Sequence, residues 1–391
     1  MPQRDSILNL PGFTIKKVSG YNPLILDIHY RRQARCIHCN GKKLRKKSSY
    51  QRTVRHETIG HRPMLLRFKA YKFYCRPCAR YFNQRFPSIG KHQRATERLR
   101  FEVYHQHTEG VSGKSLSTTY HLGKATLERW YHQRYQLEHQ ESKQRQCPIV
   151  LGIDEHSFSR KQGYATTLCD LRKHRIFDVV KGKSAQDLKS YLSQLQGKEK
   201  VKVICIDLSS SYRQLVRQYF PNAMIVADRF HVIRLLNQMC LHTYQSIDTE
   251  MKYQRGTLAA LRTNPENLSE ERRKKRDAYL VAHPAIAAIY EFKQQLHQLL
   301  MYKHRNAKYC KRLLPLFLES VNALKQSPFK PLRTLGKTLY QWREEVVRMW
   351  RFTKSNGITE GFHRKMKLIQ RRAYGFKNFE NYRLRVRVLC G

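Results

Sequence analysis

Short apolar runs alternate with helical patterns in the middle of the chain. Three runs rich in β-branched and aromatic residues, VLGID, YATTLCD and RIFDVVKG, follow one another between residues 150 and 182. The helical pattern SAQDLKSYLSQLQ, the run VKVICID, the helical pattern SYRQLVRQYF and the run AMIVAD come next. Alternation of this kind predicts an α/β domain, with the helices covering a buried sheet.

The sequence on either side has a different periodicity. Before residue 92 it is strand-like, as in SYQRTVRHETIG and RPMLLRFKAYKFY, whereas between residues 234 and 352 the apolar spacing is helical throughout. We therefore expect a multidomain α+β protein with segments 1–92, 93–146, 147–233, 234–352 and 353–391. The long helical segment reads as an all-α insertion into the α/β domain.

The net charge of the chain indicates which class of molecule it binds. Among 391 residues, 76 are Lys or Arg and 29 are Asp or Glu, which gives a formal net charge of +47. Hydrophobic residues make up 40% of the chain, enough for packed cores, so a disordered polycation is excluded. The charge requires a polyanion, with nucleic acid the first candidate. The chain contains no apolar run of membrane-spanning length and no signal-peptide pattern, so we expect a cytoplasmic protein.

Two pairs of cysteines have metal-binding spacing. Cys36 and Cys39 form one CxxC knuckle, and Cys75 and Cys78 form the other. Four thiolates complete a tetrahedral zinc site with no open position, so we expect structural Zn²⁺ in a zinc ribbon whose long hairpin fills the gap between the knuckles. Unligated thiols or redox pairs are the alternatives, and His38 is a weaker rival ligand.

Three helical patterns between residues 95 and 140 resemble a helix-turn-helix. Apolar residues at helix-turn-helix spacing, with a glycine at the turn, predict its core: Leu116, Leu122, Gly123, Leu127 and Trp130. The third helix would expose side chains suited to phosphates and base edges, namely Lys124, Thr126, Arg129 and Arg134. A generic three-helix bundle with a basic, solvated surface remains the alternative.

Three carboxylates carry the predicted chemistry. Asp154 and Asp207 close the first and fourth apolar runs, which are neighbours in a ribonuclease-H-like sheet, and Glu360 opens a basic helix far downstream. Converging there, they would hold two Mg²⁺ (or Mn²⁺) ions about 4 Å apart for cleavage of a phosphodiester bond. The simpler alternative is that both aspartates serve as turn or N-cap residues.

Further residues surround this constellation. Asp228 and His231, in VADRFHVI, are expected to support the site without holding metal; a helix cap with a partly buried histidine is the alternative. The helix after Glu360 is basic, and we expect it to grip DNA. Its candidate contacts are Arg364, Lys365, Lys367, Arg371 and Arg372. A solvated amphipathic helix would show the same composition.

Taken together, these segments resemble the insertion-sequence transposases of the ISL3 family. The matching text is CIHC…CRPC, the helix-turn-helix stretch, GIDEHSF, IDLSSSY, ADRFH and SNGITEGFHRKMKLIQRRAYGFKNFENYRLR, and it spans nearly the whole chain. The resemblance implies a DDE catalytic domain of the ribonuclease-H-like fold, with the triad on Asp154, Asp207 and Glu360. It also places Asp228 and His231 near the active site.

What the resemblance implies about function is specific. A bacterial, nucleoid-associated enzyme of this family would bind the terminal inverted repeats of its element, cleave each end and join the freed 3′-hydroxyl to target DNA, as a homodimer or larger synaptic complex. The alternatives are an inactive DNA-binding regulator derived from a transposase and a ribonuclease-H-fold nuclease for RNA or junctions.

Overall fold

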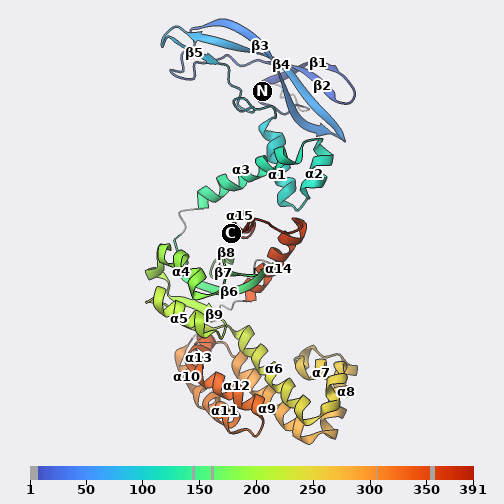
Figure 1. Ribbon diagram of the computed structural model, residues 1–391, viewed down its shortest axis with the longest axis vertical. Helices are drawn as coiled ribbons and strands as arrows, with labels where there is room; N and C mark the ends of the chain where they lie inside the picture. The colour runs from blue at the N-terminus through green and yellow to red at the C-terminus, as the bar shows by residue number, and fades with distance from the viewer. Residues whose placement is uncertain (1–7, 143–145, 160–162, 305, 353–356) are drawn as a thin grey trace. The chain divides into compact units, whose positions relative to one another are not determined.

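The structure is a computed structural model that describes residues 8–142, 146–159, 163–304, 306–352 and 357–391. The chain divides into two compact units. The first consists of residues 1–142 and 369–375, and the second of residues 143–368 and 376–391. Each unit is described by itself below, with the element labels of Figure 1.

The first unit begins with a five-stranded sheet. Its strands are β1 (Phe13–Ser19), β2 (Leu24–Tyr30), β3 (Leu44–Ile59), β4 (Arg62–Cys75) and β5 (Arg80–Asn83). The order is β1-β2-β4-β3, and β5 also pairs with β4. The long β3–β4 hairpin occupies the interval between the two CxxC motifs, as the strand-like sequence predicted.

Three helices follow this sheet in the chain: α1 (Glu97–Thr108), α2 (Gly113–Tyr120) and α3 (Lys124–Ser142). Thr96 and Ser112 cap α1 and α2, because each side chain accepts a backbone N–H three residues later. The turn between α2 and α3 consists of residues 121–123, as the sequence indicated, and its first residue, His121, is left-handed with φ 49°.

The second unit is built on another five-stranded sheet. It consists of β6 (Val150–Ser159), β7 (Gly163–Asp170), β8 (Arg175–Lys181), β9 (Val203–Ile206) and β10 (Met224–Ala227). The spatial order is β10-β9-β6-β7-β8. β6, β7 and β8 are antiparallel neighbours, and β9 and β10 add in parallel on the other side of β6. The first and fourth strands are thus adjacent, as the order of elements predicted.

Helices cover this sheet and extend beyond it. α4 (Ala185–Gln194) and α5 (Ser210–Tyr219) connect its strands. The described residues between 229 and 351 contain helices and no strand, as the periodicity predicted; Figure 1 shows them in yellow to orange beyond β9. The α-helices are α6 (Arg229–Ile247), α7 (Arg255–Arg262), α8 (Glu270–Ala282), α9 (Pro284–Met301), α10 (Ala307–Arg312), α11 (Leu314–Gln326), α12 (Lys330–Gln341) and α13 (Arg343–Arg351). The chain ends with α14 (Gly357–Arg372) and α15 (Phe379–Cys390), and α15 packs on β8.

A buried ion-pair cluster fixes α15 to the sheet. Asp178 of β8 is 4% exposed and accepts two hydrogen bonds of 2.8 Å from the Nε and Nη2 atoms of Arg383. Arg387 adds a contact of 3.5 Å, and the Tyr191 hydroxyl of α4 donates to the same carboxylate at 3.1 Å. The paired fork geometry anchors the last helix against the edge strand.

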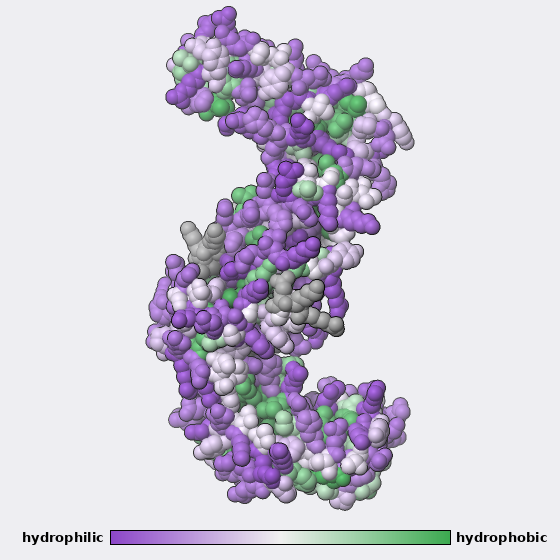
Figure 2. Space-filling view, in the orientation of Figure 1, coloured by the Kyte–Doolittle hydropathy of each residue, from purple (hydrophilic) through white to green (hydrophobic). Residues whose placement is uncertain are grey.

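Hydrophilic residues cover most of the face in Figure 2, consistent with the composition. Among the described helices, none combines the length and the apolar character that crossing a bilayer requires.

Candidate active site and metal centre

The strand register brings three aspartates to one end of the second sheet. β6 pairs with β9 in parallel, and the last pair in this register is Gly152 with Cys205, so Asp154 and Asp207 each follow two residues after that pair. β9 pairs with β10 in parallel, with Ile206 opposite Ala227, so Asp228 follows beside Asp207. Hydrogen bonding between neighbouring strands therefore gathers carboxylates that are 53 and 21 positions apart in the sequence.

Asp154 does not close its strand, in contrast to the sequence-based expectation. β6 continues to Ser159 because it pairs with the antiparallel strand β7, and Asp154 lies opposite Thr167 there. Its parallel pairing with β9 stops at Gly152. At Asp154, β6 is therefore paired with β7 but no longer with β9. The side chain of Asp154 is 13% exposed.

Glu360 joins these aspartates from the first turn of α14. Glu360 and the three aspartates all line one cavity of about 460 Å³. Its lining residues are Asp154, Glu155, Asp207, Asp228, Phe230, His231, Arg234, Gly357, Glu360 and His363. The structure therefore brings together the three residues that the sequence singled out, although Asp207 and Glu360 are 153 positions apart in the sequence.

Burial and mutual repulsion raise the pKa values of Asp154 and Asp207 in this cavity. Removal from water raises the pKa of Asp154 to about 6, and the neighbouring Asp228 and Asp207 add to the rise. The backbone N–H of Glu155, which donates to Asp154 Oδ1 at 2.8 Å, and His231 act in the opposite direction. Burial also raises the pKa of Asp207.

The donor set suits a divalent cation. Among the described residues, Asp207 Oδ1 is a buried oxygen that no hydrogen bond satisfies. An unsatisfied buried oxygen lowers the stability of the folded state unless a further group binds it. Carboxylate oxygens are the ligands that Mg²⁺ and Mn²⁺ prefer, and Asp154, Asp207 and Glu360 offer such oxygens to one cavity.

Asp228 and His231 lie at the start of α6. Asp228 is 2% exposed and caps the helix, since its Oδ1 accepts the backbone N–H of Phe230 at 3.3 Å. His231 lines the cavity, and its charge lowers the pKa of both Asp154 and Asp207. Asp228 is therefore both a helix cap and a wall of the cavity.

A chain of buried polar side chains lies behind Asp154, and the sequence reasoning missed it. His363 Nδ1 is 3.8 Å from Asp154 Oδ2, and His363 Nε2 is 3.0 Å from Thr167 Oγ1. His156 Nδ1 also contacts Thr167 Oγ1 at 3.0 Å, and its Nε2 lies 2.7 Å from the Tyr382 hydroxyl. The spacing of three between Glu360 and His363, which places both on one face of α14, was the available signal.

Glu155 also lines the cavity, although its carboxylate has other partners. It forms an ion pair of 3.3 Å with Lys183 and accepts a hydrogen bond of 3.4 Å from Tyr212. Adjacent residues of a strand face opposite sides of the sheet, which explains why Glu155 meets α5 whereas Asp154 meets α14.

The four knuckle cysteines converge in the first unit. Their Sγ atoms all lie within 4.8 Å of one another, with Cys36–Cys78 at 3.6 Å and Cys39–Cys75 at 3.5 Å. Tetrahedral zinc with Zn–S bonds of about 2.3 Å holds its sulfurs roughly 3.8 Å apart, so the arrangement fits Zn²⁺. His38 is outside this group of ligand atoms, and its backbone N–H donates to Cys36 Sγ at 3.4 Å.

Two adjoining cavities border the three-helix segment. One of them, of about 610 Å³, is lined by Thr126 and Arg129 of α3, by Arg100 of α1, and by Arg55 and Arg94. Lys124 is exposed at the start of α3. Of the predicted core residues, Leu116 and Leu127 are buried, while Leu122 and Trp130 are half-buried in the wall of that cavity.

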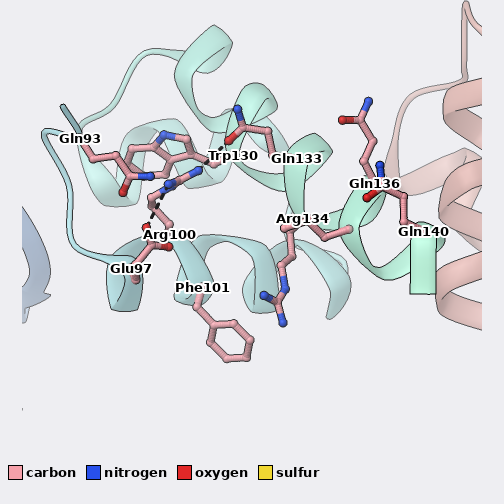
Figure 3. Close-up of a pocket in the computed structure, with 10 residues that line it drawn as sticks. Gln93, Glu97, Arg100, Phe101, Trp130, Gln133, Arg134, Gln136 and Gln140 are labelled. Atoms are coloured by element: carbon pink, nitrogen blue, oxygen red, sulfur yellow. Dashed lines mark hydrogen bonds and ion pairs between the residues drawn. The ribbon is translucent and has the colours of Figure 1, made fainter. Parts of the chain in front are cut away.

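Arg134 lies apart from these residues, along the second cavity shown in Figure 3. It forms an ion pair of 3.2 Å with Glu138, one helical turn further along α3. In the same view Arg100 lies beside Trp130 and is bonded to Glu97 and Gln133. Arg134 therefore belongs to another face of α3 than Arg129.

The predicted basic residues of α14 are all exposed: Arg364, Lys365, Lys367, Arg371 and Arg372. Arg364 pairs with Glu360 at 3.3 Å, and Lys365 bonds the carbonyl of Leu389. Arg364 is 80% exposed, so this ion pair is weak and leaves Glu360 accessible.

Comparison with known proteins agrees with the carboxylate cavity and the cysteine cluster. The family model of ISL3 DDE transposases, described as a transposase, matches residues 151–386, which include all the carboxylates of the cavity. The zinc-finger model of the transposases IS204, IS1001, IS1096 and IS1165 matches residues 32–78, which contain both CxxC knuckles. The class defined by the fold and the site is therefore a transposase with a zinc-binding segment.

The chain belongs to the ISL3 family of transposases, because the family model covers more than half of it. It is also 21% identical over 363 residues to the transposase for insertion sequence element IS1001 of Bordetella parapertussis. That alignment covers 90% of this chain and 87% of the relative. The zinc-finger match and the four clustered thiols together support a structural Zn²⁺ ion.

Proposed function

We propose that this transposase binds the terminal inverted repeats of its insertion sequence and catalyses Mg²⁺-dependent cleavage and strand transfer with Asp154, Asp207 and Glu360. The observation that carries the proposal is the convergence of these carboxylates around one cavity. The order of the second sheet, three antiparallel strands and two parallel ones with helical connections, supports a ribonuclease-H-like core.

Divalent ions bound here would activate the attacking water or 3′-hydroxyl and neutralise charge on the leaving oxygen. Asp154 and Asp207, held by adjacent strands, would supply ligands from a rigid support. Glu360 would complete the set from α14, and its neighbour Arg364 would be free to turn toward a DNA phosphate. His231 would offset part of the carboxylate charge.

The first unit supports recognition of duplex DNA. Three helices with a left-handed residue in the turn between the second and third are consistent with a helix-turn-helix. Arg55, Arg94, Arg100 and Arg129 gather around one cavity beside α3. Both ends of an element must be cut together, so we expect a homodimer or a larger synaptic complex to be the active form.

The test is strand cleavage of DNA carrying the sequences that flank the gene, in the presence of Mg²⁺ or Mn²⁺. Asp154→Asn, Asp207→Asn and Glu360→Gln should each abolish cleavage while retaining DNA binding at fixed salt. Asp228→Asn should impair it less, because Asp228 is bonded as a helix cap. Wild-type protein that binds these ends without cutting them would indicate an inactive regulator, and cleavage of RNA or junctions alone would indicate a nuclease.

A further inference from the structure

One face of α6 forms the floor of a cavity of about 650 Å³ in the second unit. Residues at intervals of three and four along the helix line it: Phe230, Ile233, Arg234, Asn237, Gln238, Leu241, His242 and Gln245. Arg262, the last residue of α7, lines it as well. This spacing marks a single helix face about 22 Å long, named here the α6 groove.

The α6 groove is continuous with the candidate active site. Phe230 and Arg234 line both the groove and the cavity that contains Asp154, Asp207 and Glu360. A flexible strand leaving that cavity along α6 would therefore enter the groove without crossing another element. The opposite side of α6 is occupied, since it packs against α9 and α12.

The lining of the groove combines three kinds of side chain. Phe230 presents an aromatic ring that is 45% exposed, and the aliphatic side chains of Ile233 and Leu241 follow it. Amides alternate with these residues, and Arg234 and Arg262 supply positive charge. α6 itself contains no Asp or Glu. Figure 2 shows hydrophobic patches among hydrophilic residues in the region of this helix.

The side-chain oxygen of one amide in the groove is notable. Asn237 Oδ1 is a buried acceptor that no hydrogen bond satisfies within the described part of the chain. A buried acceptor of this kind is stabilised by a ligand that brings an N–H donor. When bases are unpaired, the ring N3–H of thymine and the exocyclic amino groups of the other bases are such donors, whereas phosphates offer only acceptors.

These observations select one occupant. A duplex presents mainly phosphates to a convex helix face and would require a row of cations, but only two guanidinium groups line the groove. Unpaired nucleotides expose ring faces for stacking and edges for amide hydrogen bonds. We propose that the α6 groove binds unpaired bases of the DNA strand that continues from the scissile phosphate. The proposal rests on the proposed function and names a strand-binding subsite of that same site.

The first test locates the strand directly. Full-length protein is irradiated with a 12-nucleotide oligothymidylate that carries a single 5-iododeoxyuridine at successive positions, and the cross-linked peptides are identified by mass spectrometry. We expect cross-links within residues 229–262, with Phe230 among them. Cross-links confined to peptides outside this range overturn the proposal.

The second test compares charge changes on two exposed helix surfaces. Gln238→Glu combined with Gln245→Glu introduces two negative charges into the groove, and Gln295→Glu combined with Gln326→Glu introduces the same charges on α9 and α11, outside it. Fluorescence anisotropy with the labelled oligothymidylate should show at least about fivefold weaker binding for the groove variant and less than twofold for the control. Equal losses in the two variants overturn the proposal.

Stacking is tested at Phe230. Phe230→Ala should weaken single-strand binding by about tenfold, and Phe230→Trp should restore it, while binding of a duplex of equal length stays within about twofold. An unchanged affinity of Phe230→Ala contradicts the proposal. Asp154→Asn separates the two hypotheses: if it cleaves DNA normally, the proposed catalytic function fails, but its cross-links at α6 would still support the groove.

Discussion

His363 and Asp154 lie side by side, with His363 Nδ1 3.8 Å from Asp154 Oδ2, although they are separated by more than two hundred residues in the chain. The other nitrogen of His363 contacts Thr167, which is opposite Asp154 in the β6–β7 pairing. Thr167 also contacts His156. A single hydroxyl therefore holds two buried imidazole rings next to a candidate metal ligand.

Removing that hydroxyl tests its role. Thr167→Val keeps the shape of the side chain but leaves buried imidazole nitrogens without a partner, so the free energy of unfolding should fall by about 1–3 kcal/mol. Cleavage should also decrease, by roughly tenfold, because His363 is no longer held against Asp154. Urea denaturation and the cleavage assay measure the two effects. Thr167→Ser keeps the hydroxyl and should behave as wild type; identical results for both variants would refute this explanation.

The Arg383–Asp178 pair should be essential for the docking of α15. Arg383→Ala removes two hydrogen bonds of 2.8 Å and leaves a buried carboxylate with weaker partners, so we expect a loss of about 3 kcal/mol in the free energy of unfolding. Arg383→Lys should recover little, since an ammonium group cannot reproduce the fork geometry.

The control for that loss is Arg364→Ala, whose side chain is 80% exposed. This change should alter unfolding by no more than about 0.5 kcal/mol. Denaturant titration of all three variants gives the comparison, and a similar effect at both positions would argue against anchoring by Asp178.

His56 should make the first unit less stable in acid. It is 1% exposed, and its Nε2 donates to the carbonyl of Leu8 at 3.0 Å while Nδ1 meets the Thr96 hydroxyl at 2.9 Å. Burial lowers its pKa below the ordinary value, so the unfolded chain binds the extra proton first as pH falls. Stability should therefore be fully present above pH about 6.5 and decline below it.

Thermal unfolding of the wild type between pH 5 and pH 8 measures this slope. His56→Gln should flatten it, although the variant is less stable at neutral pH because a buried contact is lost. The same substitution at His29, which is exposed on β2, controls for the change of side chain. An undiminished slope in His56→Gln would assign the acid sensitivity to other groups.

Zinc removal should affect the knuckle segment selectively. Cys75→Ser eliminates one of four clustered thiols, so metal analysis should show one zinc per wild-type chain and a clear loss in the variant. Hydrogen exchange should increase around residues 36–83, because ligation and local folding are coupled. Cys310→Ser, which changes a buried cysteine outside the cluster, should retain its zinc. Equal zinc content in both variants would contradict the assignment.

The sequence by itself determined the elements and the chemical groups. CxxC spacing, β-branched runs and helical periodicity are local properties, so they predicted the knuckles, the succession of strands and helices in the second unit and the long helical segment. They also pointed to Asp154, Asp207 and Glu360, because carboxylates in so basic a chain are conspicuous. The local sequence also predicted the position of the turn before α3. It did not predict that His121 in this turn would be left-handed.

Tertiary structure alone decided how these groups meet. Whether Asp154 ends a strand depends on pairing with β7, and the placement of Asp207 between Asp154 and Asp228 depends on two parallel registers. The contacts among His363, Thr167 and His156 join two neighbouring strands to a helix nearly two hundred residues away. Such contacts arise from packing and hydrogen bonds between distant segments, and no local pattern of residues encodes their partners.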